Sequence, residues 1–228
     1  MMINILGLTL TIIVYIIVLR LKKYRLFKKT PIIIFVGFIT IFLIKLFNID
    51  YQYYNKSASI LTFLLGPATI ALAYPLYSNR HVLLTNKRAV WIGLFAATII
   101  AIISTFIVGS ILHTDLNVTM SMIPKSVTTP IAVEISKTIG GIPELTACIV
   151  ILTGLIGGLS GHRLLHACKI KNDVAIGLSI GAASHVLGTT RCYEKNKPKQ
   201  VAISTLALII VGLLTAIIAP ILLNIFIK

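Results

Sequence analysis

"IPKSVTTPIAVEISKTIGGIPEL" occupies residues 123–145 of a chain that is otherwise almost continuously apolar. The stretch holds three prolines, two lysines, two glutamates and a Gly-Gly pair. Prolines and paired glycines interrupt helices, and ionised side chains are costly inside a bilayer. Its position between two long hydrophobic runs predicts a broken segment at membrane depth, whose non-helical backbone must be buried in protein or line a wet cavity.

The overall composition indicates an integral membrane protein. Of the 228 residues, 57% are hydrophobic and only 12% are charged, and the mean hydropathy is +0.98. A soluble domain carries about 25% charged residues, so this chain has too few to build a water-facing surface. Its 21 lysines and arginines outnumber 6 acidic residues. The basic residues lie in short loops between apolar runs, which follows the positive-inside rule and requires no nucleic acid.

Apolar runs of about 20 residues predict membrane-spanning helices. We expect spans over 3–19, 31–47, 60–77, 89–112, 145–159 and 201–227, with mixed segments over 123–143 and 174–194. The expected fold is all-α and polytopic, with about seven or eight membrane segments, two of them broken or re-entrant. We interpret the first run as an uncleaved span, because it lacks a basic leader and a small-residue cleavage site. Residues 1–58 are expected to form a transmembrane hairpin for scaffolding or oligomerisation, and residues 59–228 the core with the substrate site.

The loop charges leave two topologies open. Lys169 and Lys197 lie in basic loops that both prefer the cytoplasm, yet the segment between them is short. Either residues 174–193 enter the membrane and return to the same side, with 123–143 entering from the other side, or both segments cross fully as broken helices. A weak similarity between "FLLGPATIALAYPLY" (63–77) and "LSIGAASHVLGTTRCY" (178–193) suggests paired interrupted segments, as found around transporter substrate sites.

The first mixed segment predicts an anion site. A helix that begins near Pro130 would direct free N–H groups and its positive dipole end toward Thr128 and Thr129. The site residues predicted in this segment are Lys125, Ser126, Thr128, Thr129 and Glu134. The alternative is an extracellular loop with an interfacial helix, in which these charges are solvated.

The second mixed segment contributes small residues, hydroxyls and a histidine. Ser184, His185 and Thr189 are its predicted site residues. His185 could carry a proton, or it could be a neutral side chain that is bonded to a neighbouring helix. The residues predicted to break helices are Gly66, Pro67, Pro124, Pro130, Gly140, Gly141, Gly181 and Gly188.

Metal, cofactor and enzyme chemistry have little support in the sequence. His162 and His166 have a spacing that can ligate zinc, but no further ligand follows at a suitable distance along the chain. The three cysteines show no CxxC spacing and predict no disulfide. Paired aspartates, a Ser–His pair with an orienting acid, and an HExxH motif are also missing from the sequence. We therefore expect no metal, no cofactor and no enzymatic activity.

Four motifs together resemble the CidB/LrgB family, also called the YohK or holin-like/antiholin-like family. They are "GPATIALAYPLY" (66–77), "PKSVTTPIAVEISKTIGGIPELT" (124–146), "VILTGLIGG" (150–158) and "GLSIGAASHVLGTTRCYE" (177–194), in matching order over residues 61–222. The chain reads "TTRCYE" where members often read closer to "TARALE", so the CidB-like and LrgB-like subgroups both remain open. The resemblance implies a modulator of murein hydrolase activity and cell lysis. It also implies transport, because a plastid relative carries glycolate and glycerate, and bacterial members are linked to pyruvate movement.

Two functional hypotheses follow from the residues and the resemblance. In the first, the protein carries small monocarboxylates of the pyruvate or glycolate type, with Glu134 or His185 coupling to a proton. In the second, it is a holin-like oligomeric pore, or a protein for export or regulation of murein hydrolases, without a specific substrate. The interrupted segments favour a carrier. The expected partners are a small organic anion, a proton, the lipid bilayer, further copies in a homodimer or larger oligomer, and a small CidA/LrgA-type membrane protein. The expected location is the bacterial cell membrane, as a multi-pass protein.

Overall fold

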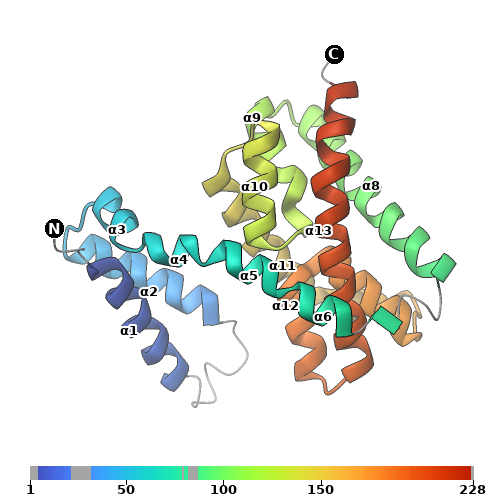
Figure 1. Ribbon diagram of the computed structural model, residues 1–228, viewed down its shortest axis with the longest axis horizontal. Helices are drawn as coiled ribbons and strands as arrows, with labels where there is room; N and C mark the ends of the chain where they lie inside the picture. The colour runs from blue at the N-terminus through green and yellow to red at the C-terminus, as the bar shows by residue number, and fades with distance from the viewer. Residues whose placement is uncertain (1–4, 22–31, 79, 82–86, 227–228) are drawn as a thin grey trace. The chain divides into compact units, whose positions relative to one another are not determined.

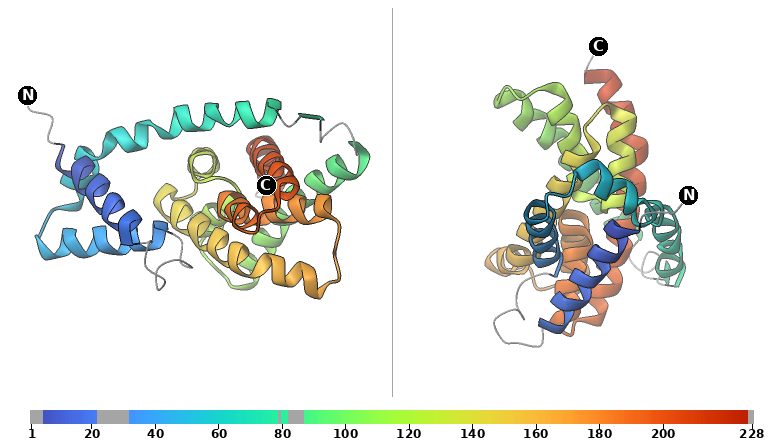
Figure 2. Two further views of the ribbon diagram at one scale, coloured as in Figure 1. Left: turned by 90° about the horizontal axis from the view of Figure 1, so that it is seen from below. Right: turned by 90° about the vertical axis from the view of Figure 1, so that its left-hand side faces the viewer.

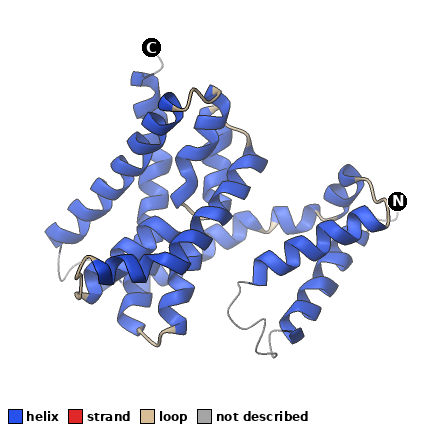
Figure 3. Cartoon of the chain, turned by 180° about the vertical axis from the view of Figure 1, so that it is seen from behind, coloured by secondary structure: helices blue, strands red, loops and turns tan. Residues whose placement is uncertain are grey.

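The structure of the protein, a computed structural model, describes residues 5–21, 32–78, 80–81 and 87–226. Within these ranges the chain consists of helices joined by loops and turns, without a β-strand (Figure 3). Four helices in the described part are long and apolar enough to cross a membrane, and two shorter apolar helices precede them. The predicted class, an all-α polytopic membrane protein, is confirmed. The chain divides into two compact units, Met1–Ala68 and Thr69–Lys228.

The first unit is a small cluster of helices. Its elements are α1 (Leu6–Leu21), α2 (Ile32–Leu46), α3 (Tyr51–Ser57) and α4 (Ser59–Phe63). α1 contacts both α2 and α3. The Gly7 amide donates to Ser57 Oγ at 2.9 Å, and the hydroxyls of Thr11 and Tyr54 lie 2.7 Å apart. These bonds tie α1 to α3, while the scaffold role expected for residues 1–58 remains a proposal.

Residues 59–78 form a helix with two interruptions. α4 is followed by α5 (Leu65–Ala71) and α6 (Ala73–Ser78), with a single non-helical residue at each junction. Each junction lies three residues before a proline, Pro67 or Pro75. Proline has no N–H to donate to the carbonyl four residues earlier, and its ring crowds that turn, so a helical hydrogen bond is lost at Phe63 and at Ala71, next to the two junctions. Gly66 and Pro67 themselves lie in the first turn of α5.

The long helices α8, α11 and α13 make up much of the second unit (Figure 1). From residue 87 on, its elements are α8 (Lys87–Ile111), α9 (Leu116–Met122), the 3₁₀ helix η1 (Ile123–Ser126), α10 (Thr129–Ile139), α11 (Pro143–Ala167), α12 (Asp173–Glu194) and α13 (Pro198–Phe226). More than half of the most apolar stretch of α13 is buried, and α13 contacts α8, α10 and α12. α13 is therefore the central element of this unit.

α8 and α13 run in the same direction. One apolar cluster joins Leu94, near the start of α8, to Ala207 in the first half of α13. A second cluster joins Ile102, farther along α8, to Ala219 and Leu223 near the end of α13. The two helices therefore begin at one end of the unit and finish at the other.

α11 is longer than the sequence suggested. The expected span ended at residue 159, followed by a basic loop, but the helix continues to Ala167. Within this extension His162 is buried, and its Nε2 lies 3.1 Å from Gln200 Oε1. Gln200 Nε2 in turn donates to the Asp173 carboxylate at 2.7 Å. The polar residues of the last turns thus have partners at the starts of α12 and α13, which stabilises a helix where a loop was expected.

α12 folds back on itself at His185. This residue has φ 39° and ψ −134°, which departs from helical geometry in the middle of the element. A methyl group on Gly188 would lie 3.0 Å from the Ile180 carbonyl oxygen, although eight positions separate the two residues. Cys192 likewise packs with Ile176 and Ile180. In a straight helix these residues would be more than 10 Å apart along the axis, so the two halves of α12 must lie side by side.

Both ends of α12 consequently lie at the end of the unit where α13 begins. The bond between Asp173, at the start of α12, and Gln200, at the start of α13, fixes this arrangement. Figure 2 shows α12, in orange, beside α13, in red. This fold-back has the geometry of the re-entrant arrangement, one of the two that the loop charges left open.

The segment α9–η1–α10 approaches from the opposite end. It follows the C-terminal end of α8, where the hydroxyls of Thr114 and Thr119 lie 2.8 Å apart. After α10 the chain returns to α9, because the Ile142 amide donates to Ser121 Oγ at 2.7 Å. Between these points η1 contacts α8, α11, α12 and α13. The second unit thus contains two helical hairpins that enter from opposite ends, and the one that pairs with α12 is α9–η1–α10, not residues 63–77 as the weak internal similarity suggested.

Candidate functional site

The tip of the first hairpin carries a lysine without an acidic partner. Lys125 is half-buried in η1, where Pro124 has the non-helical ψ of 22° that turns the chain. Its ammonium donates to Thr105 Oγ1 and, at 3.3 Å, to the Ala101 carbonyl oxygen, both on α8. Neither acceptor carries a formal charge, and within the described residues Lys125 forms no ion pair. The charge of this ammonium is therefore left uncompensated.

α10 begins beside this lysine with its donors unused. Thr128 is the N-cap residue, 3% exposed, and its side chain makes no capping hydrogen bond. Its Oγ1 is buried without a partner. The first intrahelical bond runs from the Ala132 amide to the Thr128 carbonyl, so the earlier amides of Thr129 and Ile131 lie outside the helical pattern. Pro130, the second helical residue, has no N–H, so those two amides and the Thr128 hydroxyl are the donors at this helix end.

The tip of the second hairpin is formed by Ser184 and His185, which are 1% and 4% exposed. His185 Nε2 lies 2.9 Å from the Val150 carbonyl oxygen on α11. A carbonyl only accepts hydrogen bonds, so Nε2 carries the proton and donates it. A side chain on Gly154 would collide with the imidazole, and one on Gly157 would collide with Ser184. The absence of side chains at these two positions of α11 therefore leaves the space into which the second tip packs.

The two tips meet inside the second unit. α12 contacts η1 directly. Val150, which accepts the hydrogen bond from His185, belongs to the same buried apolar cluster as Ile123 and Val127 of the first tip. The positive end of α10 follows Val127 almost directly, and Lys125 belongs to η1, so the electrostatic character of the first tip favours an anion.

The remaining predicted site residues lie at different depths. Ser126 is 8% exposed in η1, and Thr129 is half-buried at the start of α10. Thr189 Oγ1 donates to the His185 carbonyl oxygen at 3.1 Å and so closes the turn after the tip. Glu134 lies on the exposed face of α10, 71% exposed, in an ion pair with Lys137 at 2.7 Å. The structure thus buries Ser126, Thr128, Ser184 and His185 in the two tips and leaves Glu134 on an exposed face.

The predicted helix-breaking residues serve several structural purposes. Gly140 ends α10 with φ 82°, a left-handed conformation that glycine adopts without strain. Gly141 packs against Ser121 and Ser136, where a side chain would not fit. Gly181 and Gly188 lie inside the halves of α12, and Gly181 faces Ser204 of α13. The fold-back itself occurs at His185, between these two glycines.

Two features of the site were missed from the sequence. Thr105 was not among the predicted residues, because a threonine in an apolar helix ordinarily bonds its own backbone. The glycines of α11 were not among the predicted site residues either, although their spacing at 154, 157, 158 and 161 places small residues on one side of a helix. That spacing is the signal that could have identified the seat of the second tip.

A metal site has no support in the described residues. No group of three or more histidine, cysteine or acidic side chains there is arranged to hold an ion. His162 Nε2, one of the two ring nitrogens, is hydrogen-bonded to Gln200. The donors gathered at the two tips are an ammonium, amides and hydroxyls, which suit an anion and not a cation.

Comparison with known proteins adds the family. Residues 11–225 match the family model described as the LrgB-like family. The chain belongs to the LrgB-like family. It is 36% identical over 227 residues to an uncharacterized protein, YwbG, from Bacillus subtilis (strain 168), which covers 98% of this chain and 99% of the relative. It is 34% identical over 173 residues to an uncharacterized protein from Haemophilus influenzae, which covers 76% of this chain and 74% of that protein.

The LrgB-like match includes both hairpins and all the predicted site residues. The resemblance drawn from the four sequence motifs is therefore confirmed. No solved structure matches the chain. As an LrgB-like protein with several apolar helices, the chain is a membrane protein.

Proposed function

We propose that the protein is a carrier for small monocarboxylates, of the pyruvate or glycolate type, and that the carboxylate binds where the two hairpin tips meet. The observation that carries the proposal is the tip of the first hairpin. There Lys125, whose ammonium has only neutral partners on α8, comes three positions before Thr128, the cap residue of α10, whose buried hydroxyl has no partner. A buried hydroxyl without a partner costs about 1–3 kcal/mol, and a carboxylate oxygen would remove that cost.

The arrangement of the hairpins supports a carrier in preference to a simple pore. Two interrupted segments from opposite ends of a helical bundle meet at its middle, which is how many transporters build a substrate site. Each half of the bundle then contributes one tip, and a movement of one tip against the other would open the site to one side at a time. In this proposal a role in murein hydrolase control and lysis is a consequence of solute movement.

In this proposal His185 is the residue that carries the coupled proton. His185 donates through Nε2 to Val150, which leaves Nδ1 as the ring nitrogen that can gain a proton. Glu134, the other predicted proton carrier, is already paired with Lys137 on an exposed face. We therefore place coupling at His185. The protein would act as a multi-pass protein of the bacterial cell membrane, as a homodimer or larger oligomer, alone or with a small CidA/LrgA-type partner.

The test is uptake into proteoliposomes that contain only this protein. We expect saturable uptake of labelled pyruvate or glycolate without leakage of a trapped fluorescent dye. Dye leakage without saturable uptake would contradict the proposal and favour the holin-like pore.

Removing the charge of Lys125 tests whether the carboxylate binds at the tip of the first hairpin. Lys125→Gln should raise the half-saturating substrate concentration roughly 10- to 100-fold, because hydrogen bonds to a charged group contribute about 1.5–3 kcal/mol. Lys137→Gln is the matched control, since it removes one positive charge from the same segment at an exposed position. Equal uptake by wild type and a folded Lys125→Gln variant would remove Lys125 from the site.

A further inference from the structure

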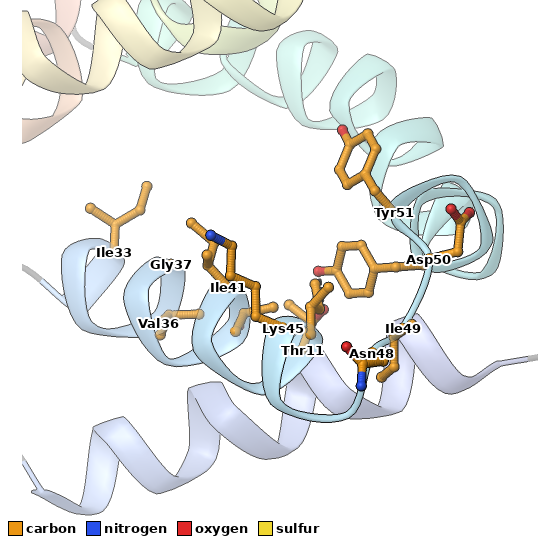
Figure 4. Close-up of a pocket in the computed structure, with 13 residues that line it drawn as sticks. Thr11, Ile33, Val36, Gly37, Ile41, Lys45, Asn48, Ile49, Asp50 and Tyr51 are labelled. Atoms are coloured by element: carbon orange, nitrogen blue, oxygen red, sulfur yellow. Dashed lines mark hydrogen bonds between the residues drawn. The ribbon is translucent and has the colours of Figure 1, made fainter.

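The first unit contains a groove that the proposed transport function does not use (Figure 4). Its volume is about 1010 Å³, and every residue that lines it belongs to residues 11–54. The apolar floor is formed along α2 by Ile33, Val36, Ile41 and Ile44. Thr11 of α1 and Tyr51 and Tyr54 of α3 border it. The groove is thus long, largely apolar, and polar at the end near α3.

A single lysine supplies the positive charge of the groove. Figure 4 shows the Lys45 side chain extending back along α2 toward Gly37 and away from Asp50. The Asp50 carboxylate is instead used at the start of α3, where it accepts from the Tyr53 amide at 3.0 Å. Within the described residues Lys45 takes part in no ion pair. Lys45 is exposed in the last turn of α2, and a lysine near the end of a membrane helix extends toward the head groups of the bilayer.

A buried hydroxyl at the same place also lacks a partner. Thr40 lines the groove and is 6% exposed, and its Oγ1 has no hydrogen-bond partner. Other helical threonines satisfy their hydroxyls on the carbonyl four residues earlier, as Thr11 does with Gly7 and Thr98 does with Leu94. Thr40 does not, so a buried hydroxyl in the wall of the groove is left without a partner.

We propose that this groove binds one anionic phospholipid of the bilayer. The phosphodiester would pair with Lys45 and the hydroxyls at the polar end, and an acyl chain would lie along the floor of α2. Basic pockets between membrane helices recognise lipid head groups in this way. A second copy of the chain is a poorer occupant, because an apolar helix would leave the Lys45 charge and the Thr40 hydroxyl unsatisfied.

The test measures which lipid the full-length protein retains. The protein is reconstituted with equal amounts of phosphatidylglycerol and phosphatidylcholine that have identical acyl chains, then extracted in mild detergent, and the retained lipid is counted by mass spectrometry. We expect the wild type to retain phosphatidylglycerol preferentially. Lys45→Gln should lower that retention about fivefold, while Lys56→Gln, which removes a charge outside the groove, should not.

A steric variant tests the groove independently of charge. A side chain added at Gly37 meets no atom within 4 Å, so Gly37→Leu fills the groove without disturbing the chain. It should abolish lipid retention without lowering the melting temperature of the delipidated protein, because leucine favours a helix more than glycine does. Gly93→Leu on α8, where the space is equally open, is the control. The proposal is overturned if Lys45→Gln and Gly37→Leu both retain lipid like the wild type, or if Gly37→Leu dissociates an oligomer while lipid retention stays the same.

Discussion

His185 holds a backbone conformation that few side chains adopt. Its φ of 39° with ψ of −134° lies in a region that is almost confined to glycine and costs about 1–3 kcal/mol for other residues. The other described non-glycine residues with positive φ are Asn48, His113, Lys169 and Asn196. Those residues lie outside helices, whereas His185 lies between two helical halves. The strain is held in place by the bond to Val150 and by close packing against Gly154.

The strain at His185 can be measured by comparing the stabilities of two substitutions at this position. In an ordinary helix, glycine is less stable than alanine by about 1 kcal/mol. At position 185 the order should be reversed, with His185→Gly more stable than His185→Ala by about 1 kcal/mol, because only glycine accepts the backbone conformation. Denaturant or thermal unfolding in mild detergent measures both variants.

Ser179, an exposed residue in the first half of α12, provides the control. There Ser179→Gly should be less stable than Ser179→Ala. The same order at positions 179 and 185 would show that α12 is not folded back at His185.

Among the elements, α11 determines where the second tip packs, because glycines on one face of α11 leave space for it. Gly154 lies against the imidazole of His185, Gly157 against Ser184, and Gly161 against Ile180. Small residues in this spacing let helices approach closely, which gains packing and brings the tip to the middle of the bundle. A fold with a bulkier α11 could not place the tip there.

Gly154→Val tests this contact. The added side chain meets the imidazole, which is held by its bond to Val150 and cannot move away freely. We expect a loss of about 1–3 kcal/mol in the free energy of unfolding, the usual cost of overpacking a core, together with loss of uptake. Gly93→Val, at an open position of α8, should have neither effect. A Gly154→Val protein as stable and active as the wild type would contradict the proposed seating.

The helices and their breaks could be predicted from the sequence to different extents. Apolar runs identified the long helices, because burial in a bilayer requires about 20 apolar residues. The position of the fold-back in α12 was not predictable, because Gly181 and Gly188 are the better turn residues and yet serve close packing. Thr105 and the groove along α2 depend on which helix faces become neighbours, and single-helix patterns do not contain that information.

Over the whole molecule, the distribution of basic residues agrees with the arrangement of the two hairpins. The basic residues on both sides of α12 prefer the cytoplasm. A re-entrant α12 satisfies both preferences, whereas a full crossing would place one group outside. The same parity requires α9–η1–α10 to enter from outside, and the direction of α8 and α13 in the structure agrees with that. We therefore expect α9–η1–α10 to enter the membrane from outside and α12 to enter it from inside.

The most direct measurement of this claim is the sidedness of the hairpin ends in intact cells. In a variant with Cys148, Cys168 and Cys192 replaced by alanine, single cysteines at Lys171, Lys195, Asn117 and Thr138 are reacted with a membrane-impermeant maleimide. We expect the first two to be labelled only after the membrane is opened, and the last two to be labelled directly from outside. Labelling of Lys171→Cys from outside and of Lys195→Cys only from inside would show that α12 crosses the membrane, and the account of two opposed hairpins would be wrong.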